Sequence, residues 1–153
     1  MENSISISAN IPSAPEVVWQ VLTSPEHLAQ IFKGQQCGCE WTVGAKVRFL
    51  ENRGGKEKVV EKGEVIRVST NKQLEYSSFP TQMGLEDTPE NYIVVCYELL
   101  DNYDGSTHLA ITQKGYKYVE GGIDRYISAQ KNWKKHLPKL IEATSTIKID
   151  AEA

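Results

Sequence analysis

The chain has 153 residues, with 17 lysines and arginines against 20 aspartates and glutamates, and a formal net charge of −3. This length suits one domain spanning residues 1–153, and the acidic surplus argues against proteins that bind nucleic acids or anionic membranes. No run of 18 apolar residues predicts a membrane span, and the N-terminus lacks the features of a signal peptide. Three cysteines do not form a disulfide framework. We therefore expect a cytoplasmic protein with reduced thiols.

The first predicted element is a strand over residues 4–11, where isoleucines and an alanine alternate with serines and an asparagine. Such alternation is typical of a strand with one buried face. Two short helices are expected next. Ser13 and Glu16 have the spacing of a capping box for the first helix, and Ser24 followed by Pro25 predicts the start of the second.

The middle of the chain is predicted to form strands with mostly short connections, which favours antiparallel pairing. One short strand would put Cys37, Cys39 and Trp41 on a single face. In a longer strand over residues 59–68 the side-chain alternation is ambiguous, and Gly63 is a candidate bulge. Elsewhere a period of two predicts an inward-facing set: Val47, Phe49, Leu74, Tyr76, Ser78, Ile93, Val95, Tyr97, Leu99, Thr107, Leu109, Ile111 and Gln113.

Two connections are predicted to be longer than a tight turn. Residues 52–58 contain two glycines and several charges, which indicates a hairpin loop. Residues 79–91 contain two prolines, a glycine and acidic side chains. Loops of about a dozen residues are often lids or binding loops, so we expect this second loop to gate a site.

The longest predicted element is an amphipathic helix over residues 122–143. Counting 100° per residue from Trp133 gives an apolar arc of roughly 100°, the usual width for a helix that faces a core. Gln130 is the polar member of this arc, and its amide needs a hydrogen-bond partner from protein, water or a ligand. The arc contains Ile123, Tyr126, Gln130, Trp133, Leu137, Leu140 and Ile141.

This order of elements predicts an α+β fold of the helix-grip type. A curved antiparallel sheet of about seven strands would wrap around the long C-terminal helix, with two short helices after the first strand. Since helix and sheet need not meet along their whole length, a cavity is expected between them. The last several residues are expected to form a disordered tail.

Several segments, taken in order, resemble the START-like or helix-grip (SRPBCC) superfamily and, within it, the activator of Hsp90 ATPase homologue family. Each segment is a weak signal alone, and together they cover nearly the whole chain: residues 15–28, PEVVWQVLTSPEHL, then Trp41-Thr42-Val43-Gly44, Gly63-x-Val65, Leu74-x-Tyr76, Tyr97-Glu98-Leu99, Gly105-x-Thr107-x-Leu109 and Trp133-x-x-x-Leu137-x-x-Leu140. The resemblance implies a deep pocket between sheet and helix, used elsewhere in the superfamily for lipids, hormones and polyketides. It implies no single activity, because fold does not fix function.

The side chains expected to face inward combine aromatic rings with polar groups, which is how sites for small molecules are lined. An ordinary core is the alternative, although buried tyrosines and tryptophans then need partners for their polar atoms. The predicted cavity lining comprises Trp41, Phe49, Tyr76, Phe79, Tyr97, Gln113, Tyr126, Gln130, Trp133 and Leu137.

Other reactive side chains give weaker patterns. Cys37 and Cys39 supply two of the four ligands of a zinc site, and Cys96 is expected to face outward, so we predict no metal and no cofactor. The histidines show no spacing that indicates a catalytic triad, and no catalytic residue is predicted. A basic cluster on the long helix indicates a solvated face or a docking site for an acidic partner: Lys131, Lys134, Lys135, His136 and Lys139.

The leading functional hypothesis is non-catalytic binding of a small hydrophobic or amphipathic molecule in the cavity. The second, implied by the resemblance, is a co-chaperone that binds an Hsp90-type chaperone. The third is a cyclase- or hydrolase-like enzyme, which would need an acid or base inside the cavity. The predicted outward positions of Glu40, Glu98 and His108 count against the third hypothesis. Monomer and homodimer both remain open.

Overall fold

The computed structural model describes residues 3–147, and the predicted C-terminal tail lies outside them. In this range the chain forms seven strands, three α-helices and one 3-10 helix. Their bounds are β1 Ser4–Ile11, α1 Pro15–Thr23, α2 Pro25–Ile31, β2 Gln36–Cys37, β3 Lys46–Arg53, β4 Lys56–Ser69, β5 Gln73–Pro80, η1 Pro89–Asn91, β6 Ile93–Asp101, β7 Thr107–Lys114 and α3 Gly122–Ser145. None of the helices described is long and apolar enough to cross a membrane.

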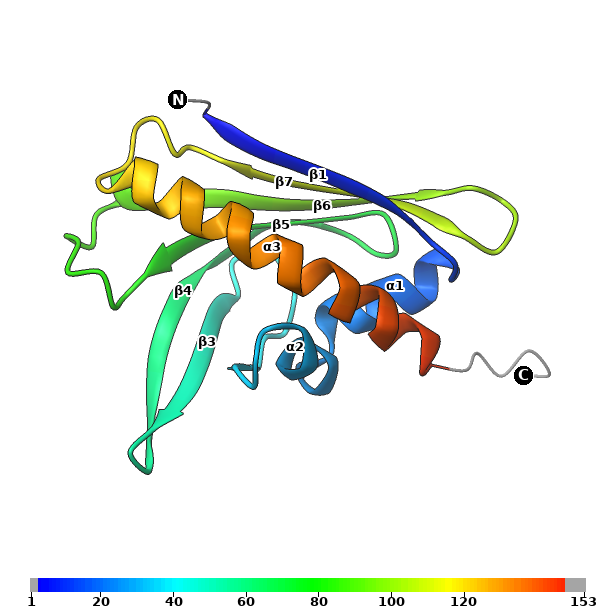
Figure 1. Ribbon diagram of the computed structural model, residues 1–153, viewed down its shortest axis with the longest axis horizontal. Helices are drawn as coiled ribbons and strands as arrows, with labels where there is room; N and C mark the ends of the chain where they lie inside the picture. Colours follow the sequence, from blue (N-terminus) through cyan, green and yellow to red (C-terminus); the bar gives the residue numbers. More distant parts are fainter. Residues whose placement is uncertain (1–2, 148–153) are drawn as a thin grey trace.

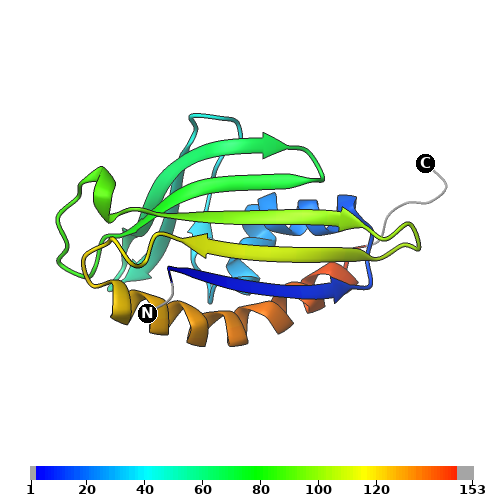
Figure 2. The ribbon, with the colours of Figure 1, turned by 90° about the horizontal axis from the view of Figure 1, so that it is seen from above.

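The strands form one sheet in the order β1-β7-β6-β5-β4-β3-β2, and every neighbouring pair is antiparallel. The sheet curves, and α3 runs across its concave side (Figure 1). In Figure 2 α3 is drawn below the strands, and α1 and α2 lie behind the strands toward the end where α3 finishes. This arrangement confirms the predicted α+β helix-grip fold.

The core lies between the concave face of the sheet and the three helices. The alternation predicted for β1 and β7 is confirmed: Ile11, Leu109 and Ile111 are at most 1% exposed. In β6 the predicted inward residues are buried, but Cys96, which is predicted to face outward, is also only 8% exposed. From the helices, α1 contributes Val18, Val21 and Leu22, α2 contributes Leu28 and Ile31, and α3 contributes Trp133, Leu140 and Ala143.

The predicted capping box at the start of α1 is wrong. Ala14 is the N-cap residue, and no side chain caps the helix. The Ser13 carbonyl instead accepts a hydrogen bond of 2.7 Å from the Thr107 hydroxyl, which ties the entry of α1 to β7. Pro15 starts the helix as expected, since its missing N–H costs nothing in the first turn.

The hairpin between β3 and β4 is tighter than predicted. Both strands continue toward the turn, to Arg53 and from Lys56, so the connection is Gly54-Gly55 rather than residues 52–58. Both glycines have positive φ angles, 61° and 82°, as a two-residue hairpin turn requires.

β4 contains the irregularity that made its alternation ambiguous. The pairing with β3 shifts between Phe49, which pairs with Glu61, and Leu50, which pairs with Val59, so Val60 is the extra residue of a bulge. A bulge lets two successive side chains face the same side of a sheet, and both Val60 and Glu61 line the concave side. The bulge predicted at Gly63 is therefore wrong.

Gly63 serves a different purpose, which is a close approach of two strands. A Cβ atom at this position would lie 1.6 Å from the Ser77 carbonyl oxygen of β5. The neighbouring Glu64 N–H also donates a hydrogen bond of 3.0 Å to the Ser77 hydroxyl. Only glycine lets the backbones of β4 and β5 come this close.

The inward face of α3 also differs from the prediction. Ile123 is 61% exposed and Gln130 is exposed, whereas Arg125 is only 6% exposed. At about 100° per residue, the buried face is centred roughly 60° away from the predicted apolar arc. The face that α3 turns toward the sheet is therefore more polar than its most apolar side.

We predict that Gly63→Ala destabilises the protein by about 2 kcal/mol or more, because the added methyl group meets backbone rather than a flexible side chain. Gly38→Ala is the matched control, since a Cβ at Gly38 meets no atom within 4 Å, and its effect should stay within about 0.5 kcal/mol. Urea unfolding of both variants measures the difference. Equal stabilities would contradict the close approach of β4 and β5.

Candidate functional site

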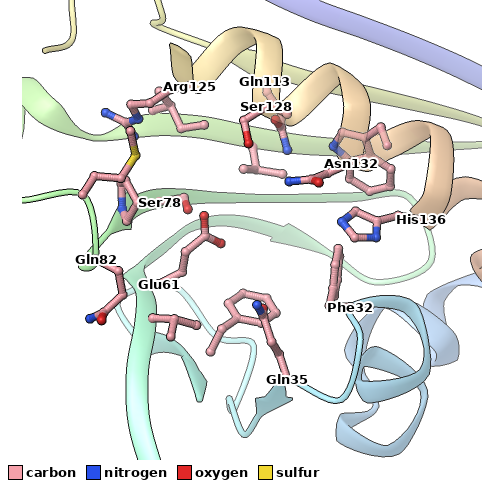
Figure 3. Close-up of a pocket in the computed structure, with 18 of the residues that line it drawn as sticks. Phe32, Gln35, Glu61, Ser78, Gln82, Gln113, Arg125, Ser128, Asn132 and His136 are labelled. Carbon is pink, nitrogen blue, oxygen red and sulfur yellow. The ribbon is translucent and has the colours of Figure 1, made fainter. Parts of the chain in front are cut away.

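A cavity of about 420 Å³ separates α3 from the concave face of the sheet. Its sheet wall carries Phe49, Val60, Glu61, Tyr76, Ser78, Val95, Tyr97 and Gln113, and its helix wall carries Arg125, Ser128, Ala129, Asn132, Trp133 and His136. The segment after α2 closes one end with Phe32, and the connection after β5 borders the other with Gln82 (Figure 3). Met83 also lines the cavity. The volume lies in the range usual for small-molecule sites.

One end of the cavity is aromatic. Phe32 packs edge-on against Phe49, Trp133 and His136, with ring centroids 5.5, 6.1 and 4.8 Å apart. Tyr97 continues this wall and lies 6.2 Å from the Trp133 ring. Edge-to-face contacts fix the ring orientations, so this end presents a rigid apolar surface.

The other end of the cavity is polar and contains the carboxyl group of Glu61. Burial raises the pKa of Glu61, while the positive charge of Arg125 and a hydrogen bond with the Ser78 side chain lower it. Within residues 3–147, Glu61 takes part in none of the ion pairs with an N–O distance up to 4.0 Å. A carboxylate thus lies inside the cavity without a direct cationic partner.

Arg125 is held in place by the chain segment that precedes β6. Its Nη1 atom donates a hydrogen bond of 2.7 Å to the backbone carbonyl of Asn91. The Asn91 side chain in turn donates to the Glu86 carbonyl at 2.8 Å and accepts from the Glu120 N–H at 3.0 Å. Asn91 therefore fixes both the long loop and the start of α3, and Arg125 is oriented before any ligand arrives.

Three tyrosines share the electrostatic field of Glu61. Burial is the main cause that raises the pKa values of Tyr76, Tyr97 and Tyr116, and the carboxylate of Glu61 raises each further. All three hydroxyls remain protonated hydrogen-bonding groups at neutral pH. Tyr116 donates to the Gln113 Oε1 atom at 2.7 Å, which fixes the Gln113 amide at the cavity wall.

His136 lies at the boundary between the aromatic end and solvent. Burial lowers its pKa to about 4, the Ile31 backbone opposes this shift, and three nearby lysines favour it. Its buried Nδ1 atom has no hydrogen-bond partner among the described residues. At neutral pH the ring is therefore uncharged and adds no net charge to the cavity.

Five of the ten residues predicted to line a cavity lie at its wall: Phe49, Tyr76, Tyr97, Gln113 and Trp133. Whether they contact a ligand stays a prediction. The long connection predicted over residues 79–91 begins later, because β5 extends to Pro80, and Gln82 and Met83 border the cavity. Its role as a gate also stays a prediction.

Trp41 and Phe79, which are also predicted lining residues, do not lie at the cavity wall. The strand expected through Trp41 ends at Cys37, and Trp41 adopts a positive φ of 48°. Its indole N–H donates to the Thr23 carbonyl at 3.0 Å, so the ring packs behind Tyr76. Phe79 alternates with Ser78 on β5, and it stacks on Tyr92 with centroids 5.0 Å apart, away from the cavity.

The predicted lining residues Tyr126, Gln130 and Leu137 also do not lie at the cavity wall, because the buried face of α3 is rotated. Tyr126 packs edge-on against Tyr116, and Gln130 is exposed and donates to the Tyr126 hydroxyl at 3.1 Å. Leu137 is partly buried against the core but does not border the cavity.

Sequence reasoning missed Glu61, Arg125 and His136 as cavity residues. Counting back in steps of two from the buried Val65 reaches Glu61, so the alternation held a usable signal. Arg125 and His136 lie about 80° and 60° from Trp133 on the side opposite the predicted arc. Apolar content alone pointed to the wrong side of the helix.

The cysteines give no support for metal or nucleophilic chemistry. Burial raises the pKa of Cys37 to about 12 and also raises that of Cys39, so both thiols stay protonated at neutral pH. Among the residues that the structure describes, no three histidine, cysteine or acidic side chains group as a metal site would require.

Comparison with known proteins identifies the family of this chain. The family model described as Activator of Hsp90 ATPase homolog 1-like protein matches residues 12–145. No curated protein matches the chain.

Several solved structures are similar to the chain. Protein MLL2253 from Mesorhizobium loti is 21% identical, with a TM-score of 0.75 over 95% of this chain and 99% of that one. ChR145 from Cytophaga hutchinsonii is 24% identical, with a TM-score of 0.72 over 96% and 100%. PFC0360w, an HSP90 activator from Plasmodium falciparum, is 16% identical, with a TM-score of 0.69 over 91% and 94%. At these identities the likeness is one of fold.

We predict that His136→Phe removes a pH dependence of stability. With a folded-state pKa of about 4 and an ordinary value of 6.5, the contribution of neutral His136 is complete above pH 6.5 and is lost as pH falls toward 4. Because the ring keeps some solvent contact, we expect the loss to be about 1–2 kcal/mol.

Urea unfolding of wild type and variant at pH 7 and pH 5 tests this. Glu61 has the opposite sign, since a raised pKa adds stability as pH falls, but it is present in both proteins and cancels in the comparison. An unchanged pH dependence in the variant would contradict the burial of His136.

Proposed function

We propose, since the chain belongs to the family of Activator of Hsp90 ATPase homolog 1-like proteins, that it binds a small, partly apolar molecule in the cavity between the sheet and α3, without catalysis. The cavity lining combines aromatic rings with a few polar groups. Apolar ligand surface would leave water against Phe32, Phe49 and Trp133, and polar groups at the other end would orient the molecule.

The observation that carries this proposal is the Glu61 carboxyl group inside the cavity. Glu61 is half-buried, and a carboxylate that has lost part of its hydration is costly unless hydrogen bonds or an opposite charge compensate it. Ser78 and the more distant Arg125 compensate only in part, since burial still raises the pKa of Glu61. A ligand that donates a hydrogen bond to Glu61 would supply the missing compensation.

The helix wall keeps room for such a ligand because its middle carries small side chains. Ser128 and Ala129 border the cavity, followed one turn later by Asn132 and Trp133. Larger side chains at the first two positions would project into the space that the ligand needs. This makes Ala129 the natural position at which to close the cavity.

We predict that the protein binds N-phenyl-1-naphthylamine, a neutral aromatic probe that fluoresces when it leaves water, at one saturable site. Ala129→Leu should weaken this binding at least about tenfold, because the longer side chain occupies the cavity. Fluorescence titration measures both affinities.

Gln130→Leu is the matched control, since it adds a leucine at the next position of α3, which is exposed. Its affinity for the probe should equal that of wild type. Non-saturable binding, or equal loss in both variants, would refute binding between the sheet and α3.

A second candidate function, that of a co-chaperone, is favoured by the family model and by the solved structure from Plasmodium falciparum that is described as an HSP90 activator. In this function the partner would be an Hsp90-type chaperone and the contact would involve the outer surface. The basic side chains on the exposed face of α3 would suit an acidic partner surface, among them Lys131, Lys134 and Lys135.

For this second function we predict binding to purified Hsp90 at micromolar concentration and a rise in its ATPase rate. Replacing Lys131, Lys134 and Lys135 by glutamate should weaken that binding at least about tenfold, because three charges are reversed. Ala129→Leu should leave it unchanged. Absence of binding at micromolar concentration would exclude the co-chaperone function.

A further inference from the structure

The interior of the cavity holds two opposite charges on facing walls. Glu61 comes from β4 and Arg125 from the first turns of α3, and Figure 3 shows both side chains at the same end of the cavity. The remaining charged groups lie at its rim, where Glu51 pairs with Arg53 at 2.8 Å and Lys33 is exposed. With His136 uncharged, the interior is left with one acidic side chain and one basic side chain.

The two charges are close enough to influence each other but do not form a direct ion pair. Each shifts the pKa of the other, yet no N–O distance up to 4.0 Å joins them among the residues described. Arg125 cannot simply swing toward Glu61, because its guanidinium is bound to the Asn91 carbonyl. The space between them is therefore a preformed position for a polar group.

A ligand group at this position meets both charges. An anionic group is attracted by Arg125 and repelled by Glu61, whereas a cationic group is attracted by Glu61 and repelled by Arg125. In both cases the attraction and the repulsion largely cancel. An ion would still lose its hydration on entering the cavity. An uncharged group with one donor and one acceptor gains from both walls, because it can donate to Glu61 and accept from Arg125.

The Gln113 amide is a further polar group at the cavity wall, and it favours a ligand that carries a hydrogen-bond acceptor. The Gln113 Oε1 atom is occupied by the Tyr116 hydroxyl at 2.7 Å, so the Nε2 atom, which has no partner among residues 3–147, is the group left to donate into the cavity. The aromatic end, with Phe32 and Trp133, matches a flat apolar ring.

From this geometry we propose that the cavity selects an uncharged aromatic molecule whose polar group donates a hydrogen bond to Glu61 and accepts one from Arg125. Glu61 and Arg125 are then the residues that determine specificity. This proposal rests on the proposed binding function, and it adds the charge and the hydrogen-bonding pattern of the ligand.

Three probes with the same ring test the proposal: naphthalene-2-sulfonamide, which is neutral, naphthalene-2-sulfonate, which is an anion, and 2-(aminomethyl)naphthalene, which is a cation at pH 7. Each competes with N-phenyl-1-naphthylamine, and isothermal titration calorimetry measures each directly. We expect the sulfonamide to bind at least about fivefold more tightly than either ion, since each added hydrogen bond contributes about 1 kcal/mol.

Glu61→Gln should reverse part of this order, because it removes the negative charge and leaves the interior with the charge of Arg125. The sulfonate should then bind at least about fivefold more tightly than it binds wild type, and the cation should bind more weakly. Glu64→Gln is the matched control: it makes the same change on the same strand at an exposed position, and the order of the three probes should not change.

The possible results distinguish the proposed charge selectivity of the cavity from the proposed binding function itself. A sulfonamide preference that Glu61→Gln abolishes and Glu64→Gln preserves supports the inference. If the naphthylamine probe binds in the cavity but an ion binds wild type as tightly as the sulfonamide, the inference fails and the binding function stands. If no aromatic probe binds in a way that Ala129→Leu weakens, both fail together.

Discussion

The structure depends on α3 being held at its two ends while its middle spans a gap. At its start, Arg125 is bound to the Asn91 carbonyl, which belongs to the segment leading into β6. Toward its end, Leu140 and Ala143 are fully packed among the strands, α1 and α2. Between these anchors the sheet curves away from the helix (Figure 1), and the cavity occupies the space that remains.

The curvature of the sheet comes from local features of β4. The bulge at Val60 and the close approach at Gly63 lie within four residues, and a bulge increases the bend and twist of a strand. The bulge turns Val60 to the same side as Glu61, which already faces the concave side by the alternation from Val65. β4 therefore supplies both an apolar side chain and the carboxyl group to the same wall of the cavity.

Most of the fold could be predicted from the sequence, because it follows from short-range patterns. The alternation in β1, β6 and β7, the proline-started helices and the long C-terminal helix each depend on residues within one segment. The errors arise where two segments set the geometry. Gly63 is required by the Ser77 carbonyl of another strand, and the Thr107 hydroxyl, at the start of β7, donates a hydrogen bond to the Ser13 carbonyl. No local pattern contains these contacts.

The candidate site was harder to predict than the fold for a related reason. Apolar periodicity finds the side of a helix that avoids water, and on α3 that side includes Ile123, which is 61% exposed. The side that faces the cavity instead carries Arg125 and His136 beside Trp133. A cavity wall holds polar groups because it is not a dry core, so a rule that detects apolar cores misses part of its lining. Arg125 also anchors the start of α3 on the Asn91 carbonyl, so the fold accounts for its position. Burial of the Glu61 carboxyl group costs free energy, and no direct ion pair among the described residues repays this cost. Glu61 is therefore the side chain of this wall that the proposed ligand has to explain.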